Sequence, residues 1–459
     1  MKLFFLILFV VIFIVNIKVQ SQMKFAVIGD YGKAGANELS VSNLVKSWNP
    51  EFIITLGDNN YELGEQATID ANIGQYYRQF IFPYTGSYGA GDTVNRFFPS
   101  LGNHDWYTTA ASAYLNYFSL PGNERYYDFI KGNIHFFIID SDPNEPDGVD
   151  SNSVQANWLK NSLAVSSQRF NLVYFHHPPY SSGSHGNNPY MNWPFKKWGA
   201  DAVLSGHDHT YERININSFT YIINGLGGKS IYTFNTPIAG SIVRYNNNYG
   251  AMLVNSYEDS LTFRFYSISG NLKDNFKLIP SQKTLTLNIL IEGFYNPVLN
   301  TMQSDTLKVF LRNGNSPYQI IDSSKGNINS SGAGTFTFTK ANNSTPYYIE
   351  IIHRNSIETW SSSGINFNLN NHSYDFTTSA NKSYGNNLFL KGLKYCVFSG
   401  DVNQDNYIDA SDLSTVGNGA DVSLNGYVSA DVTGDNFVDA SDISIVEKNS
   451  FTPVTVSRP

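Results

Sequence analysis

The sequence has few of the features that mark disulfide-stabilised, nucleic-acid-binding or membrane-spanning proteins. Among its 459 residues there is one cysteine, Cys396, so no disulfide framework can form within the chain. Lysine and arginine total 30 against 38 aspartates and glutamates, and no basic stripe occurs, which argues against nucleic acid as a partner. Charged residues make up only 15% of the chain and aromatic residues also 15%, a balance that favours β-rich domains. Packing, together with any bound metals, must therefore hold the fold together.

Long apolar runs are also missing after the first residues. Met1 and Lys2 precede the apolar stretch Leu3–Val15, and Val19 and Ser21 place an apolar and a small residue at positions −3 and −1 of a cleavage site before Gln22. This pattern predicts a signal peptide over residues 1–21 and a secreted protein, whether extracellular, cell-surface or periplasmic. The alternative is an uncleaved N-terminal anchor, although the run is short for a membrane span. No later stretch is apolar enough to span a membrane, so none is expected in the mature protein.

Strand-like and helix-like patterns alternate over residues 23–280. Lys24–Gly29 and Phe52–Leu56 read as strands around a helix at Asn37–Trp48, which is a β-α-β unit and predicts an α/β domain. Tyr249–Leu278 alternates like hairpins, which indicates a second, more antiparallel sheet. The other expected strands are Phe97–Leu101, Ile134–Ile139, Leu172–Phe175 and Ala202–Leu204, and the other expected helices are Val154–Leu163 and Trp193–Trp198.

The remainder of the chain divides into two further units. Residues 282–393 contain short strand patterns separated by Asn, Ser and Gly clusters, which predicts an all-β, immunoglobulin-like sandwich without a chemical site of its own. Residues 397–459 contain an internal repeat, in which Asp401–Leu413 returns as Asp431–Ile443.

Five apolar strands of the first domain each end in a polar cluster. The clusters are GDYG at 29–32, GDNNY at 57–61, GNHD at 102–105, HHPP at 176–179 and GHDHTYER at 206–213. Ligands bind at the carboxyl ends of strands in open α/β sheets, so these side chains are expected to meet. Carboxylate, imidazole, phenolate and amide groups suit Fe, Mn or Zn, and their number suits two ions that share a carboxylate. A single Gly-Asp pair could instead be an ordinary turn, and a lone histidine an ordinary hydrogen-bonded residue, but five polar clusters in order favour a site.

Together the clusters resemble the calcineurin-like metallophosphoesterases and, within them, the purple acid phosphatases, over Lys24–Ile279. The first motif of the wider superfamily has Asp-x-His, and Gly32 stands at that histidine position. The purple acid phosphatases have a tyrosine in the second motif instead, and Tyr61 stands there. The resemblance implies a two-sheet sandwich flanked by helices.

The same resemblance implies a set of metal ligands. Asp30, Asp58, Tyr61 and His209 would hold Fe(III), whereas Asp58, Asn103, His176 and His207 would hold a divalent Fe, Zn or Mn ion. The phenolate would colour the protein. A metal-bound hydroxide would then attack a phosphate ester at acid pH.

The remaining histidines of the motifs have different expected roles. The family places its histidine ligand two residues before a proline, which favours His176 over His177. Side chains alternate along a strand, so the two rings should point apart. The resemblance makes His104 and His185 the groups that contact phosphate and protonate the leaving alcohol. The alternative for His185 is a solvent-exposed loop residue. Asp105 is expected to orient His104, and Arg213 to pair with Glu212.

Each copy of the C-terminal repeat reads as a calcium loop. The copies resemble the duplicated calcium loop and helix of a dockerin, which would bind a cohesin-like or cell-surface partner. The alternative is that the module packs against the sandwich. Thr433 stands where Asn or Asp is usual, which predicts weaker binding by the second loop. The expected ligands are Asp401, Asn403, Asp405, Tyr407, Asp409 and Asp412 in the first loop, and Asp431, Thr433, Asp435, Phe437, Asp439 and Asp442 in the second.

The sequence therefore predicts a secreted acid phosphatase with two metal ions that hydrolyses phosphate monoesters. A phosphodiesterase or nucleotidase on the same site is the nearest alternative. A surface-attached binding protein without turnover is the alternative of another class.

Overall fold

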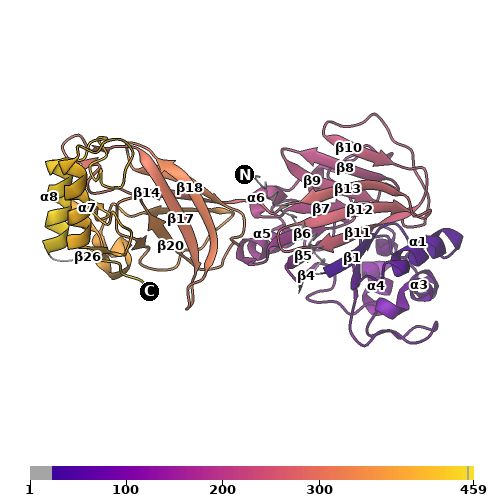
Figure 1. The fold of residues 1–459 in the computed structure, drawn as a ribbon. Helices are drawn as coiled ribbons and strands as arrows, with labels where there is room; N and C mark the ends of the chain where they lie inside the picture. The colour runs from indigo at the N-terminus through magenta and orange to yellow at the C-terminus, as the bar shows by residue number, and fades with distance from the viewer. Residues whose placement is uncertain (1–22, 452–453) are drawn as a thin grey trace, which may run out of the picture.

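The chain folds into two lobes that meet at the linker near residue 280 (Figure 1). The structure is a computed structural model and describes residues 23–451 and 454–459. The predicted signal peptide, residues 1–21, lies outside the described residues. In the described part of the chain, no helix has the length and apolarity needed to cross a bilayer.

The first lobe is built on two sheets packed face to face. The first sheet has the order β13 (Leu272–Leu278), β12 (Leu261–Ser267), β11 (Gly250–Ser256), β1 (Met23–Ile28), β2 (Phe52–Thr55) and β3 (Phe97–Pro99). The second has the order β10 (Ser241–Tyr245), β8 (Tyr211–Ile216), β9 (Phe219–Asn224), β7 (Ala202–Ser205), β6 (Phe170–Tyr174), β5 (Ile134–Ile138) and β4 (Tyr127–Lys131).

Helices cover the outer faces of this sandwich. The helix α5 shows why they form where they do: the side chain of Ser153 caps its first turn by accepting from the Ala156 amide, and Ala156, Leu159 and Leu163 are buried at helical spacing. These side chains pack on the second sheet, whereas the main core fills the space between the sheets. The helices of this lobe are α1 (Ala36–Ser47), α2 (Gln66–Ile69), α3 (Gln75–Tyr77), α4 (Ser112–Tyr117), α5 (Val154–Val165) and α6 (Phe195–Trp198).

The sequence predicts the parallel part of this lobe correctly. The strands β1, β2 and β3 are parallel neighbours, as are β5, β6 and β7. The prediction that Tyr249–Leu278 forms a second sheet is wrong, because β11 pairs antiparallel with β1 and extends the first sheet. Hairpin periodicity specifies that strands pair with one another, but it does not specify which free edge accepts them.

The second lobe begins with a β-sandwich, as predicted. One sheet has the order β19 (Ala333–Phe338), β14 (Lys283–Asn288) and β22 (Asn371–Asp375), and the other β18 (Ile320–Ile328), β17 (Asp305–Asn313), β20 (Tyr347–Ile352) and β21 (Thr359–Trp360). Three two-stranded antiparallel sheets complete the lobe: β15 (Tyr295–Asn296) with β16 (Thr301–Met302), β23 (Phe389–Lys391) with β24 (Lys394–Cys396), and β25 (Tyr407–Ile408) with β26 (Val454–Thr455).

The repeat region forms two helices, α7 (Ala410–Asp421) and α8 (Ala440–Phe451), and these share one hydrophobic core with the sandwich. At the junction, a Cβ atom on Gly293 would lie 1.9 Å from the carbonyl oxygen of Val432, so the two backbones touch. The buried side chain of Glu292 accepts from the side-chain amide of Asn449 at 2.8 Å and pairs with Lys448. The C-terminal repeat therefore packs against the sandwich.

Candidate metal centre

The five polar clusters come from both sheets and meet at one end of the first lobe. The first three follow β1, β2 and β3, and the other two follow β6 and β7. Asp30, Asp58 and His207 each adopt a left-handed backbone conformation, with φ of 55°, 53° and 68°. Such conformations cost free energy for residues with a Cβ atom and concentrate at functional sites. Here they turn the side chains off the strand ends and toward one another.

The first group of donor atoms surrounds the Tyr61 hydroxyl. This oxygen lies 2.8 Å from Oδ2 of Asp58, 3.1 Å from Oδ1 of Asp30 and 3.2 Å from Nε2 of His209. The His209 nitrogen lies 3.2 Å from the same Asp30 oxygen. All four side chains are buried. Four donor atoms this close together could all coordinate a single metal ion.

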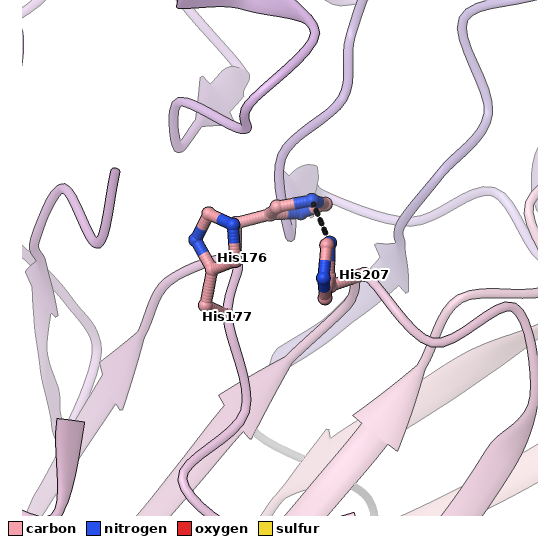
Figure 2. A group of neighbouring side chains, drawn as sticks. All are labelled: His176, His177 and His207. Atoms are coloured by element: carbon pink, nitrogen blue, oxygen red, sulfur yellow. Dashed lines mark hydrogen bonds between the residues drawn. The ribbon is translucent and has the colours of Figure 1, made fainter. Parts of the chain in front are cut away.

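A second group shares Asp58 with the first. The Nε2 atom of His176 lies 3.1 Å from Oδ1 of Asn103, 3.4 Å from Oδ2 of Asp58 and 3.2 Å from Nδ1 of His207. Figure 2 shows that last contact as a dashed line between a nitrogen of the His176 ring and a nitrogen of the His207 ring. The Asn103 oxygen also lies 3.1 Å from Nδ1 of His207. Asp58 therefore places one carboxylate oxygen, Oδ2, close to side-chain donor atoms of both groups.

Backbone and hydroxyl groups fix how the rings are turned. The Nδ1 atom of His176 donates to the carbonyl of Leu56 at 2.8 Å, which leaves Nε2 with its lone pair toward the centre. His209 is held in the same way by its Nδ1 contact of 2.6 Å with Oγ of Ser230. Such contacts orient metal-binding imidazoles and increase their basicity.

The electrostatics of the group reflect closely spaced ionisable donors. Burial raises the pKa of Tyr61 well above its ordinary value, and Asp30 and Asp58 raise it further. Burial is the largest influence on the pKa of Asp58 and would raise it, but the charges and hydrogen bonds of His176 and His104 together outweigh burial, and the pKa is lowered. For His176, burial opposes and Asp58 favours the charged form, and the pKa rises to about 10. In the metal-free site, protons on Tyr61 and His176 thus lie where a bound metal ion would contact the same oxygen and nitrogen atoms.

The donor set fits two cations. Asp30, Asp58 and His209 form one compact group of ligand atoms, and His176, His177 and His207 form another. Carboxylate and phenol oxygens dominate the first and suit a hard trivalent ion, whereas imidazoles dominate the second and suit a divalent ion such as Zn, Fe or Mn. All seven predicted ligands lie in these groups, or in contact with them.

His177 lies closer to the centre than the sequence predicts. The expectation that its ring points away from His176 is wrong, because β6 ends at Tyr174 and strand alternation no longer applies two residues later. Its ring centre lies 4.4 Å from that of His207, and its Nδ1 atom lies 2.9 Å from Oγ of Ser141 (Figure 2). Only the position of Ser141, far away in sequence, would have indicated this orientation.

His104 and His185 both flank the donor groups. The Nδ1 atom of His104 donates to the carbonyl of Glu62 at 2.5 Å, so Nε2 is the atom that faces the site, 3.9 Å from Oδ2 of Asp58. The His185 ring stacks on His207 with centres 4.3 Å apart, and His185 is also exposed. His185 thus combines the two alternatives, because it is an exposed loop residue that touches the centre.

Two supporting contacts differ from expectation. Asp105 accepts from the backbone amides of Asn59 and Gly102 and does not orient His104, which the Glu62 carbonyl holds instead. Arg213 pairs with Asp274, not with Glu212, because neighbouring residues on β8 point to opposite faces.

The structure also explains the glycine at position 32. A Cβ atom there would lie 1.9 Å from the carbonyl oxygen of Asn59. No side chain fits at this position while the two turns keep this spacing. A histidine ligand is therefore excluded at position 32, whereas the Tyr61 hydroxyl lies beside Asp30 and His209.

The C-terminal loops adopt the same conformation twice. Asp412 accepts from the amides of Val402 and Asn403, and Asp442 accepts from the amides at the same two places in the second loop. Asn406, which replaces the usual glycine, has a left-handed φ of 76°. All twelve predicted ligands lie in these two loops or at the starts of α7 and α8.

Comparison with known proteins gives a consistent result. Residues 23–211 match the family model of the calcineurin-like phosphoesterases. Purple acid phosphatase 17 of Arabidopsis thaliana is 26% identical over 251 residues, covering 48% of this chain and 72% of the relative. Human tartrate-resistant acid phosphatase type 5 is 25% identical over 246 residues, covering 45% and 73%.

A similar solved structure is that of GAP50, described as the anchor in the inner membrane complex of Plasmodium. It has a TM-score of 0.47 and 21% identity, and the match covers 57% of this chain and 90% of GAP50. Taken together, the sequence matches show a calcineurin-like phosphoesterase domain with purple acid phosphatase homologues at low identity, and they support a hydrolase.

Proposed function

We propose that the chain is a secreted acid phosphatase that hydrolyses phosphate monoesters at a two-metal centre. The observation that carries this proposal is the position of Asp58, which touches Tyr61 in one donor group and His176 in the other. Asp30, Asp58, Tyr61 and His209 would hold Fe(III). Asp58, Asn103, His176 and His207 would hold a divalent Fe, Zn or Mn ion. Such a pair supplies a nucleophile below neutral pH and neutralises the charge on the phosphate.

The chain's own residues then orient the substrate and move its proton. His104 is buried on one side by Tyr61, with ring centres 4.3 Å apart, and its free Nε2 faces the centre. With Nδ1 committed as a donor to Glu62, the imidazolium form carries its second proton on Nε2, at the atom that faces the leaving alcohol. His185, stacked on His207, lies where it can hold a phosphate oxygen. Their buried neighbours keep water away from the side of the centre that faces the core.

The test combines metal analysis with kinetics. We expect purified protein to contain close to two metal ions per chain, iron among them, and to hydrolyse p-nitrophenyl phosphate faster than its bis ester. The reverse preference would favour the phosphodiesterase or nucleotidase alternative. Two bound metals without hydrolysis of any phosphate ester between pH 4 and 8 would favour a binding protein that has lost turnover.

We further propose that the two C-terminal loops bind calcium and stabilise the second lobe. The loop geometry and the shared core support this role, since ions in the loops would stiffen segments that pack against the sandwich. A role in attachment to a cohesin-like or cell-surface partner remains a separate proposal. Deleting residues 397–459 and following cell association would test it, with a heat-stability measurement to detect damage to the shared core.

A further inference from the structure

A pocket of about 520 Å³ lies beside the proposed metal centre and has no part in the chemistry described so far. Pockets of this size hold small organic molecules or parts of them. Its lining includes Trp106, Tyr107, Thr108, Arg125, Asn144 and Pro146.

One wall of the pocket continues directly from the metal centre. It follows Asn103 and His104 in the loop after β3. The Tyr107 ring stands nearly perpendicular to that of His104, with centres 5.0 Å apart. Tyr107 is 59% exposed, so its other side is available to a ligand. A group attached to phosphate at the centre and directed past His104 therefore reaches Tyr107.

The opposite wall is tied to the other donor group. It belongs to the loop after β5, in which Ser141 contacts His177, and His177 in turn lies against His207. Trp106 joins the two walls, because its Nε1 atom donates to Oδ2 of Asp140 at 2.7 Å. Both walls are thus anchored to residues of the centre, which fixes the pocket relative to the phosphate position.

The charges of the pocket select against a second anion. Arg125 is the one cation among the lining residues named, and its guanidinium is already paired with Glu145 at 2.9 Å and with Asp147 at 3.0 Å. A further phosphate or carboxylate would find no uncompensated positive charge there and two acidic side chains close by. A neutral flat ring would find the faces of Trp106 and Tyr107.

We propose, building on the proposed phosphatase function, that this pocket binds the planar aromatic part of the leaving alcohol. Both an aryl group and a nucleobase have this chemistry, and each is a flat apolar surface with polar edges. Thr108 and Asn144 on the pocket wall provide hydroxyl and amide groups for such edges.

Two matched substrate pairs test the proposal and separate the two kinds of ring. Benzyl phosphate and ethyl phosphate differ in the ring, as do adenosine 5′-monophosphate and ribose 5-phosphate, while the leaving oxygen stays similar within each pair. We expect the ring to raise kcat/KM roughly tenfold in at least one pair, the gain expected of one aromatic contact. The pair that shows the gain identifies an aryl group or a nucleobase as the ligand.

Tyr107→Ala should reduce this preference to near unity, mainly by raising KM for the ring substrates. Damage to His104 would instead lower kcat for all four substrates. Trp106→Phe, which keeps a ring, provides a second variant and should retain part of the preference. Phe451→Ala removes an exposed aromatic ring from α8 in the other lobe and serves as the control.

Equal kcat/KM within both pairs in active wild-type protein would overturn the proposal and leave the phosphatase function intact. An unchanged preference in Tyr107→Ala would also overturn it. Failure of the wild type to hydrolyse any of the four substrates would overturn the proposed function, and this inference with it.

Discussion

Replacing Tyr61 by phenylalanine separates the structural role of the hydroxyl from its role as a ligand. In metal-free protein the hydroxyl donates to Asp58 at 2.8 Å inside a buried site. A hydrogen bond to a charged group contributes about 1.5–3 kcal/mol to stability, and its loss also leaves a buried carboxylate oxygen without its donor. For a domain of this size, that corresponds to a fall in Tm of about 3–12 °C.

The assay has two readouts and a matched control. Thermal unfolding of metal-free protein reports the hydrogen bond, and the visible spectrum of iron-loaded protein reports the phenolate. Tyr77→Phe is the control, because the structure gives this buried hydroxyl no partner among the described residues, so its removal should not lower the Tm and should leave the visible band unchanged. A visible band of normal position and strength in Tyr61→Phe would refute the assignment of Tyr61 as a ligand. An unchanged Tm in metal-free Tyr61→Phe would refute the energetic argument.

Three further predictions concern the second lobe. Burial raises the pKa of the Cys396 thiol to about 12, so native protein at pH 8 should react with a maleimide far more slowly than urea-unfolded protein. Burial and the charge of Asp412 raise the pKa of Asp401 to about 7. Without calcium, this raised pKa contributes stability below pH 4 that is lost as the pH rises to 7. Calcium must displace that proton, so its affinity for the first loop, measured by calorimetry, should fall about tenfold per pH unit below pH 7, and Asp401→Asn should reduce this dependence. The Arg354 guanidinium lies 3.3 Å from Asp431 at the start of the second loop, so Arg354→Met should strengthen calcium binding there by about 1 kcal/mol, and equal affinity in both proteins would contradict this.

The meeting of the candidate ligands at one place could be predicted because each one follows a strand. Asp30, Asp58 and Asn103 lie one or more residues beyond an apolar run, and parallel strands bring such positions to one end of the sheet. The order of the motifs along the chain then distinguishes Tyr61 and the histidines from ordinary turn residues. Local sequence pattern and sheet topology agree at this end of the lobe, and for that reason the position of the site could be predicted from the sequence.

Features that depend on contacts between distant loops could not be predicted. The orientation of His177 is set by Ser141, and the position of His104 by the Glu62 carbonyl, neither of which has a sequence signal. The edge that accepts β11 is a choice among free strands, so periodicity cannot decide it. The pocket at Trp106 is formed by two loops from different sheets.

The backbone contact at Gly293 has a consequence for how this chain can be divided or recombined. The sandwich and the helical repeat bury each other's apolar side chains. If residues 282–459 were divided between them, each part would expose those side chains to solvent. A fusion protein that contains only the last sixty or so residues as a tag would expose this apolar surface and would be prone to aggregate. Gene rearrangement or engineering should therefore transfer the whole stretch as a single cassette, with the phosphoesterase lobe as the part that can be exchanged.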